Sequence, residues 1–190
     1  MIRLFTFIHV KYYKKSILPA PPYIIIANHT SYFDIFLMYS ILPYNHFLFL
    51  GKSEILSYPL VKSFFIDLNI PVFRGTGKAA RSFVEAKNAL KKGWSLAIFP
   101  EGGIPDENYP LMIPFKEGAF KLAKTMKVPI IPITYKNNHR LFSDPTHILG
   151  PARPGISKVY IHPYFSVESI QNKTIEELRE EAFQLISSKL

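Results

Sequence analysis

The 190-residue sequence contains no cysteine. This absence excludes disulfide bonds, thiolate catalysis and cysteine-based metal sites, and nothing suggests a secreted disulfide scaffold. No apolar stretch reaches the roughly 18–20 residues of a transmembrane helix. Residues 1–10 are largely apolar but lack a small-residue cleavage site, so we do not interpret them as a signal peptide.

Acidic residues are also few: 14 Asp and Glu stand against 23 Lys and Arg, which gives a net charge of +9 at pH 7. Such a basic chain favours an acidic partner, which could be nucleic acid, an anionic membrane or a phosphorylated ligand. Hydrophobic residues make up 48% and aromatic residues 15% of the sequence, which argues against disorder. The length suits one domain with a sizeable core.

Short apolar segments alternate with helical patterns, which predicts βαβ units and an α/β fold. We expect strands at residues 23–27, 70–73, 94–99, 128–134 and 159–165, with a further apolar run at 47–50. We expect helices at residues 58–65, 78–92, 115–126 and, after a capping-box pattern at Thr174, up to Ser188. Pro129 and Pro132 suggest an edge strand or an irregular ladder for residues 128–134.

The opening of the chain has apolar residues at helical spacing together with several basic residues. Residues 1–15 could therefore form a basic amphipathic helix in a membrane interface, or a helix packed on the domain with its lysines in water. We divide the chain into an amphipathic membrane-interface segment at 1–19 and one domain at 20–190. The lysines that could face an anionic leaflet are Lys11, Lys14, Lys15, Lys91, Lys92, Lys121, Lys124 and Lys127.

A polar turn with one imidazole and one carboxylate, His29 and Asp34, lies between two apolar runs. On a continuous helix their spacing would place them about 140° apart, so they can meet only if the chain bends between them. We expect a strand to end near Ala27 and a helix to begin around Ser31 or Asp34. Asp34 could then accept a hydrogen bond from His29 Nδ1, which would leave Nε2 to act as a general base. As an isolated pair, they are more often ordinary turn and capping residues.

Two further polar clusters follow predicted strands, where ligands gather in α/β sheets. Arg74, beside Gly75, offers a planar cation suited to a phosphate. Gly102 and Gly103 could offer backbone N–H groups to an anion, whereas Glu101 would orient Arg74 or a substrate hydroxyl. Each cluster could also be a plain turn. No Gly-x-Ser-x-Gly pattern marks a serine nucleophile, so the attacking hydroxyl is expected to belong to the substrate.

Four short patterns occur in order along residues 20–135. They are Asn-His-x4-Asp at 28–34, an arginine after a strand at 72–75, Phe-Pro-Glu-Gly at 99–102 and Val-Pro-Ile-x-Pro at 128–132. In this order and spacing they resemble the motifs of the lysophosphatidate acyltransferase (1-acylglycerol-3-phosphate acyltransferase) family of glycerolipid acyltransferases. Two departures stand out. Gly103 replaces the Thr or Ser that often follows the third motif, and the long hydrophobic N-terminal segment of many members is missing.

The resemblance implies a single α/β domain with a mixed central sheet flanked by helices. It implies that His29, oriented by Asp34, takes the proton from a lysophospholipid hydroxyl, which then attacks the thioester of acyl-CoA or acyl-carrier protein. Arg74, Gly75, Glu101 and Gly102 would hold the acceptor's phosphate and glycerol. Neither a cofactor nor a metal is implied. The enzyme would sit peripherally or monotopically on an anionic membrane surface, on the cytoplasmic face of the inner membrane.

Several alternatives remain open at this point. The acceptor could be lysophosphatidate, glycerol-3-phosphate or lyso-ornithine lipid, and water as acceptor would make the protein a thioesterase. A non-catalytic lipid or acyl-CoA binding module would keep the pocket without the chemistry. Nucleic-acid binding rests on net charge alone, since no recognised motif supports it, and we expect no nucleic-acid partner. Phe33 and Phe36 could line an acyl channel or simply belong to the core.

Overall fold

The computed structural model describes residues 8–15, 17–31, 33–42, 45–52, 69–72, 78–105, 111–142 and 153–190. The predicted helix at 58–65 and the cluster around Arg74 and Gly75 lie outside these residues. Among the described residues, no helix is long and apolar enough to cross a membrane.

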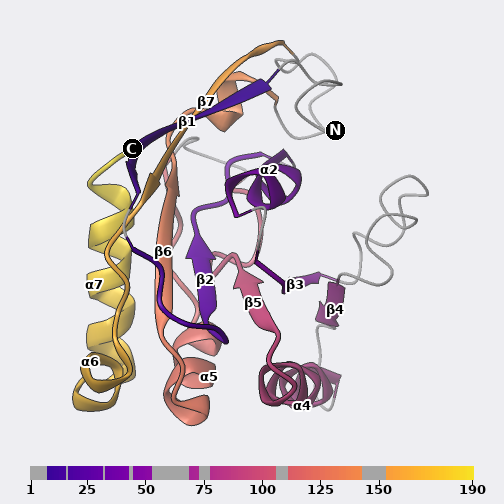
Figure 1. Cartoon of the computed structure of the whole chain (residues 1–190), viewed down its shortest axis with the longest axis vertical. Helices are drawn as coiled ribbons and strands as arrows, with labels where there is room; N and C mark the ends of the chain where they lie inside the picture. The colour runs from indigo at the N-terminus through magenta and orange to yellow at the C-terminus, as the bar shows by residue number, and fades with distance from the viewer. Residues whose placement is uncertain are drawn as a thin grey trace.

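A mixed sheet forms the centre of the molecule (Figure 1). Among the described residues it has seven strands in the order β1-β7-β6-β2-β5-β3-β4. They are β1 (Ile8–Lys15), β2 (Ile24–Ala27), β3 (Phe47–Lys52), β4 (Asn69–Val72), β5 (Ser95–Ile98), β6 (Ile130–Tyr135) and β7 (Gly155–Ile161). β6 and β7 are antiparallel, whereas the other neighbouring strands are parallel. The predicted α/β class with a mixed sheet is confirmed.

Helices cover both faces of this sheet, as the two hydrophobic clusters show. The described helices are α2 (Phe33–Ile41), α4 (Lys78–Lys91), α5 (Gly118–Met126), the 3₁₀ turn η2 (Asn138–Arg140), α6 (Val167–Asn172) and α7 (Ile175–Ser187). Ile24 and Ile26 pack with α4, α5, α6 and α7, whereas Ile25 and Ala27 pack with α2. This division follows from the period-2 alternation of a strand buried on both faces.

The parallel direction of β2 and β5 brings the ends of both strands to one edge of the sheet. Figure 1 shows their arrowheads pointing towards α2, with α4 and α5 near the opposite ends. β6, which is parallel to β2, ends at the same edge and continues into η2. The loops after β2, β5 and β6 therefore meet there, as expected for a ligand-binding edge.

The N-terminal segment corrects one prediction. Ile8–Lys15 is a strand that pairs in parallel with β7, so a helix over residues 1–15 is wrong for this part. Ile8 and Tyr12 are four residues apart, which fits helical spacing, but with Val10 they also fit the alternation of a strand. Tyr12 ties the strand to α2, because its hydroxyl donates to the carbonyl of Ile41 at 2.9 Å. The membrane-interface role of residues 1–19 stays a prediction.

The proline-bearing strand β6 is central, since it lies between β2 and β7, so the edge alternative is wrong. The irregular-ladder alternative is confirmed. Ile133 lies opposite Ile161. Ile130 lies opposite Phe165, which offsets the register by one residue. Pro132 lies within this bulge, where the missing N–H of a proline is tolerated.

The element boundaries differ from the sequence predictions by a few residues. The helix expected from Phe115 begins at Gly118, and the last strand is Gly155–Ile161 rather than residues 159–165. The short helix α6 was not predicted. The capping box is confirmed: Thr174 caps α7 and exchanges hydrogen bonds with Glu177.

Candidate active site

Asn28 joins the ends of β2 and β6. Its Nδ2 donates to the carbonyl of Tyr135 at 2.9 Å, and its Oδ1 accepts from the N–H of Tyr135 at 2.8 Å. The side chain thus extends the hydrogen bonding between the two strands beyond Ala27, their last paired residue on β2. This fixes the point from which the next residue, His29, leaves the sheet.

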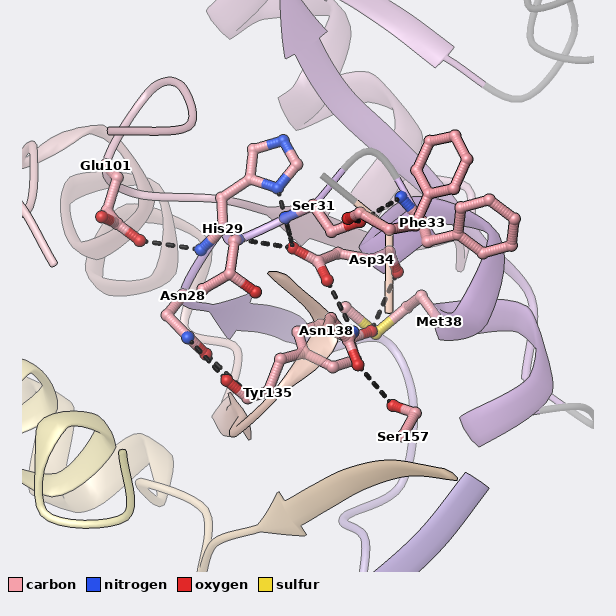
Figure 2. A network of polar contacts seen from close by, with 12 residues as sticks. Asn28, His29, Ser31, Phe33, Asp34, Met38, Glu101, Tyr135, Asn138 and Ser157 are labelled. Carbon is pink, nitrogen blue, oxygen red and sulfur yellow. Dashed lines mark hydrogen bonds and ion pairs between the residues drawn. The ribbon is translucent and has the colours of Figure 1, made fainter. Parts of the chain in front are cut away.

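His29 and Asp34 meet as the sequence predicted. The chain turns after β2, and His29 Nδ1 lies 3.0 Å from Asp34 Oδ2 (Figure 2). A carboxylate oxygen only accepts hydrogen bonds, so Nδ1 is the donor and carries the proton. Nε2 is then the ring nitrogen that can accept one. Asp34 is fully buried, whereas the His29 side chain keeps 10% of its surface exposed.

Asp34 is held by its own turn. Its Oδ2 also accepts from the backbone N–H groups of Thr30 at 2.7 Å and Ser31 at 2.8 Å. Asp34 lies in the first turn of α2, where the helix dipole favours a negative charge. The N–H of Phe33 in turn donates to Ser31 Oγ at 3.1 Å, which fixes the start of the helix.

Asn138 also contacts Asp34, and the sequence interpretation missed it. Its Nδ2 donates to Asp34 Oδ1 at 2.6 Å, and its Oδ1 accepts from Ser157 Oγ at 2.6 Å (Figure 2). Asn138 and Ser157 are both fully buried. The available signal was the pair Asn137-Asn138 shortly after the strand at 130–135, on the edge where the other polar clusters gather.

Tyr135, at the end of β6, also contacts the turn that carries Asp34. Its hydroxyl donates to the carbonyl of Asp34 at 2.9 Å and lies 3.6 Å from Met38 Sδ. Burial, followed by the nearby Asp34 carboxylate, raises the pKa of this phenol well above its usual value. Tyr135 therefore stays neutral and acts here as a donor.

Glu101 follows β5 and binds backbone on both sides. Its Oε1 accepts from the N–H of His29 at 2.7 Å, and its Oε2 accepts from the N–H of Ile113 at 3.0 Å. Only 1% of the residue is exposed, and this burial raises the pKa of its carboxyl to about 7. The predicted substrate-binding role stays a prediction, because these contacts are to the protein's own backbone.

Gly102 has a positive φ of 78°, which favours glycine at this turn. Its N–H donates to the carbonyl of Phe99 at 3.0 Å, so the expectation that this group is open to an anion is wrong. The reason is local, because the turn after β5 closes on itself. A Cβ at Gly102 would also meet the flexible end of the Lys116 side chain. A substrate contact by another part of this turn stays a prediction.

Phe99, the last residue before this turn, covers the imidazole. The rings of His29 and Phe99 are stacked with centroids 4.0 Å apart and planes 15° from parallel. Phe99 is itself stacked on Phe49, with centroids 6.2 Å apart. The site is thus polar on the Asp34 side of the ring and aromatic on its face. Arg74 and Gly75 lie outside the described residues, so their predicted place at the site stays a prediction.

Comparison with known proteins now adds to this geometry. A family model described as Acyltransferase matches residues 9–136, which is more than half of the chain. The chain belongs to the Acyltransferase family. The match to this family spans His29, Asp34 and Glu101 but ends before Asn138 and Ser157.

Individual proteins similar in sequence to this chain are also acyltransferases by name. The chain is 32% identical to 1-acyl-sn-glycerol-3-phosphate acyltransferase of Saccharomyces cerevisiae, over 95% of this chain and 59% of that protein. It is 30% identical to 1-acyl-sn-glycerol-3-phosphate acyltransferase alpha of Mus musculus, over 80% of this chain and 53% of that protein. The chain therefore spans somewhat over half the length of these curated relatives.

The fold is also similar to that of a solved acyltransferase. The crystal structure of the 1-acyl-sn-glycerophosphate acyltransferase PlsC from Thermotoga maritima matches with a TM-score of 0.73 and 25% sequence identity. The match covers 97% of this chain and 71% of that structure. The mixed sheet with its covering helices is therefore shared with a solved member of this group.

Proposed function

We propose that the protein transfers a fatty acyl group from acyl-CoA or acyl-carrier protein to the free hydroxyl of a lysophospholipid. The acceptor is 1-acyl-glycerol-3-phosphate and the product is phosphatidate. The activity for which these relatives are named supports this acceptor. The observation that carries the proposal is the His29–Asp34 pair, 3.0 Å apart and placed where the strands β2, β5 and β6 end.

The reaction follows from the orientation of the imidazole. His29 Nε2 takes the proton of the acceptor hydroxyl while the hydroxyl oxygen attacks the thioester carbonyl carbon. The tetrahedral intermediate then collapses, the carbon–sulfur bond breaks, and the departing thiolate receives the proton from His29. Asp34 stabilises the imidazolium that forms between the two steps. General base assistance of this kind is typically worth about 10²–10⁴ in rate.

The proposed function also includes binding of the acceptor and attachment to a membrane. Arg74 and Gly75 hold the phosphate and glycerol of the acceptor, together with the turn of Glu101 and Gly102 through groups other than the Gly102 N–H. The net charge of +9 supports peripheral or monotopic attachment to an anionic membrane surface, on its cytoplasmic face.

The test is thiol release from palmitoyl-CoA by detergent-purified protein, with and without lysophosphatidate. We expect acceptor-dependent release by the wild type and a loss of about 10²–10⁴ in H29A. H46A is the matched control, because His46 is an exposed histidine that precedes β3, away from the strand ends that carry the site. It should release thiol as the wild type does.

Three outcomes would change the assignment. Release that needs no acceptor would make the protein a thioesterase. Release only with glycerol-3-phosphate or lyso-ornithine lipid would keep the chemistry and change the acceptor. No release with any acceptor, from either acyl-CoA or acyl-carrier protein, would leave a non-catalytic binding module.

A further inference from the structure

We propose that Asn138 is a positioning residue of the active site, which locks the Asp34 carboxylate in the orientation that His29 needs. This inference rests on the proposed function and extends it to a residue beyond the segment that matches the family. Asn138 acts through Asp34, since the contact it makes at the site is to the carboxylate and not to the imidazole.

The orientation of the Asn138 amide follows from its two partners. Asp34 Oδ1 can only accept, so it must face the Nδ2 end of the amide, which lies 2.6 Å away. The amide oxygen then faces Ser157, whose hydroxyl donates at 2.6 Å. Asp34 thus sets the orientation of the amide, and Ser157 anchors its other end, which keeps the donor directed at Asp34.

Asn138 holds the Asp34 carboxylate from outside its own turn. The donors to Asp34 Oδ2 come from His29, Thr30 and Ser31, which lie on the same turn as Asp34 and would move with it. Asn138 holds the other oxygen from η2, and η2 is tied through Ser157 to β7. The carboxylate is thus fixed from two independent parts of the fold, which limits rotation about its Cβ–Cγ bond. A rotated carboxylate would release Nδ1 and allow the other tautomer of His29.

The neighbouring Asn137 provides a matched control. Its Nδ2 donates to the carbonyl of Ile156 at 2.9 Å, and its Oδ1 accepts from the N–H of Lys158 at 2.8 Å. These two bonds dock η2 onto β7 without touching Asp34. If Asn138 merely helped this docking, replacing either asparagine would have the same effect.

The first measurement is steady-state kinetics of the acceptor-dependent thiol release for N138A and N137A. We expect N138A to lower kcat about 10- to 100-fold, the loss typical of a buried hydrogen bond to a charged group, with little change in KM. N137A should keep kcat within about twofold of the wild type. Equal losses in both variants, or a loss confined to KM, would overturn the positioning role.

The second measurement is a double-mutant cycle with Asp34. In the D34N background, adding N138A should cost less than about twofold, because residues that act as a unit are not additive. A further loss as large as that in the wild-type background would show that Asn138 acts elsewhere, and would overturn the proposal.

The third measurement does not depend on activity. In ¹⁵N-histidine-labelled protein, NMR reports which ring nitrogen carries the proton, with the His29 signals assigned from H29Q. We expect Nδ1–H in the wild type and in N137A, and a mixture of tautomers in N138A and D34N. An unchanged tautomer in N138A would overturn the inference. If the wild type released no thiol, the proposed function would fail, yet this comparison would still decide the role of Asn138.

S157A keeps the inference testable if N138A does not fold. It retains the amide donor but removes the hydrogen bond that anchors the other end of the amide. In S157A we expect a lower kcat and a mixture of His29 tautomers, as in N138A, but both changes should be smaller. Wild-type kcat together with an unmixed tautomer would overturn the proposal.

Discussion

Glu101 shows how a single buried carboxyl can hold the backbone of the site in place. Its two oxygens join the backbone of His29, 72 residues before Glu101, to the backbone of Ile113, 12 residues after it. Burial makes the ionised form costly, and this cost exceeds the stabilisation from the two N–H donors, so the pKa rises from 4.5 to about 7. The nearby charge of Asp34 contributes to the same rise.

This pKa predicts how stability depends on pH. The folded state binds the Glu101 proton more tightly than the unfolded chain does, so the free energy of unfolding falls as pH rises from 4.5 to about 7. The fall from this group is about 3 kcal/mol at most and ends above the folded pKa. Chemical denaturation of wild type and E101Q across pH 4–8 measures the difference. Parallel curves for the two proteins would contradict the raised pKa.

Gly102 carries a second prediction at this scale. G102A places a side chain on a residue with φ of 78° and against Lys116, so we expect it to lower the free energy of unfolding by about 1–2 kcal/mol. The control is G118A, in the first turn of α5, where a Cβ meets nothing within 4 Å. That variant should gain about 0.4–1 kcal/mol. Equal effects in the two variants would show that the turn tolerates alanine.

At the scale of elements, α7 is held at its two ends as well as through its apolar face. α7 buries Leu178, Ala182 and Ile186 completely and begins at the capping box of Thr174. The carbonyl of Ile186 accepts a hydrogen bond from Thr134 Oγ1 on β6 at 2.9 Å. The helix is thus tied at its far end to the strand that leads into η2 and Asn138.

The cap of α7 gives a prediction for the element. T174A removes the side chain that accepts from the N–H of Glu177, and we expect a loss of about 0.5–2 kcal/mol in the free energy of unfolding. T125A, an exposed threonine inside α5, is the control and should be neutral or slightly stabilising. Thermal or chemical denaturation would measure both. A larger loss in T125A would place the stabilisation elsewhere than in the cap.

At the scale of the whole molecule, some of the lysines form contacts within the protein, and others are exposed. Lys121 pairs with Glu117, and Lys124 donates to backbone carbonyls at Gln171 and Lys173. Two of the lysines expected at a membrane are therefore engaged within the protein. Lys91, Lys92 and Lys127 are exposed and remain candidates.

The net charge predicts salt-sensitive binding to anionic vesicles. We expect the protein to co-sediment with phosphatidylglycerol vesicles and to bind neutral phosphatidylcholine vesicles less, because each lysine near an anionic surface contributes about 1 kcal/mol. Raising the salt to about 1 M, where the Debye length is about 3 Å, should remove most of the difference. Equal binding to both vesicle types at low salt would point to an apolar contact instead.

Much of the architecture was predictable because its signals are local. The strand before the His-Asp turn, the helix closed by Gly93 and the capping box of Thr174 each depend on neighbouring residues, and the structure has all three. The N-terminal segment was not predictable, because the spacing of its apolar residues fits a helix and a strand alike. Its pairing with β7, far along the chain, decides between them.

The sequence by itself determined the order of the motifs, the bend that brings His29 to Asp34 and the resemblance to a family. All of these lie within short stretches of chain. Only the tertiary structure decided what holds Asp34 from outside its turn, since Asn138 is 104 residues away and reaches it through the pairing of β6 with β2. It also decided that Glu101 binds the backbone of His29, 72 residues away. No local pattern records such contacts, because they depend on which strands become neighbours when the sheet forms.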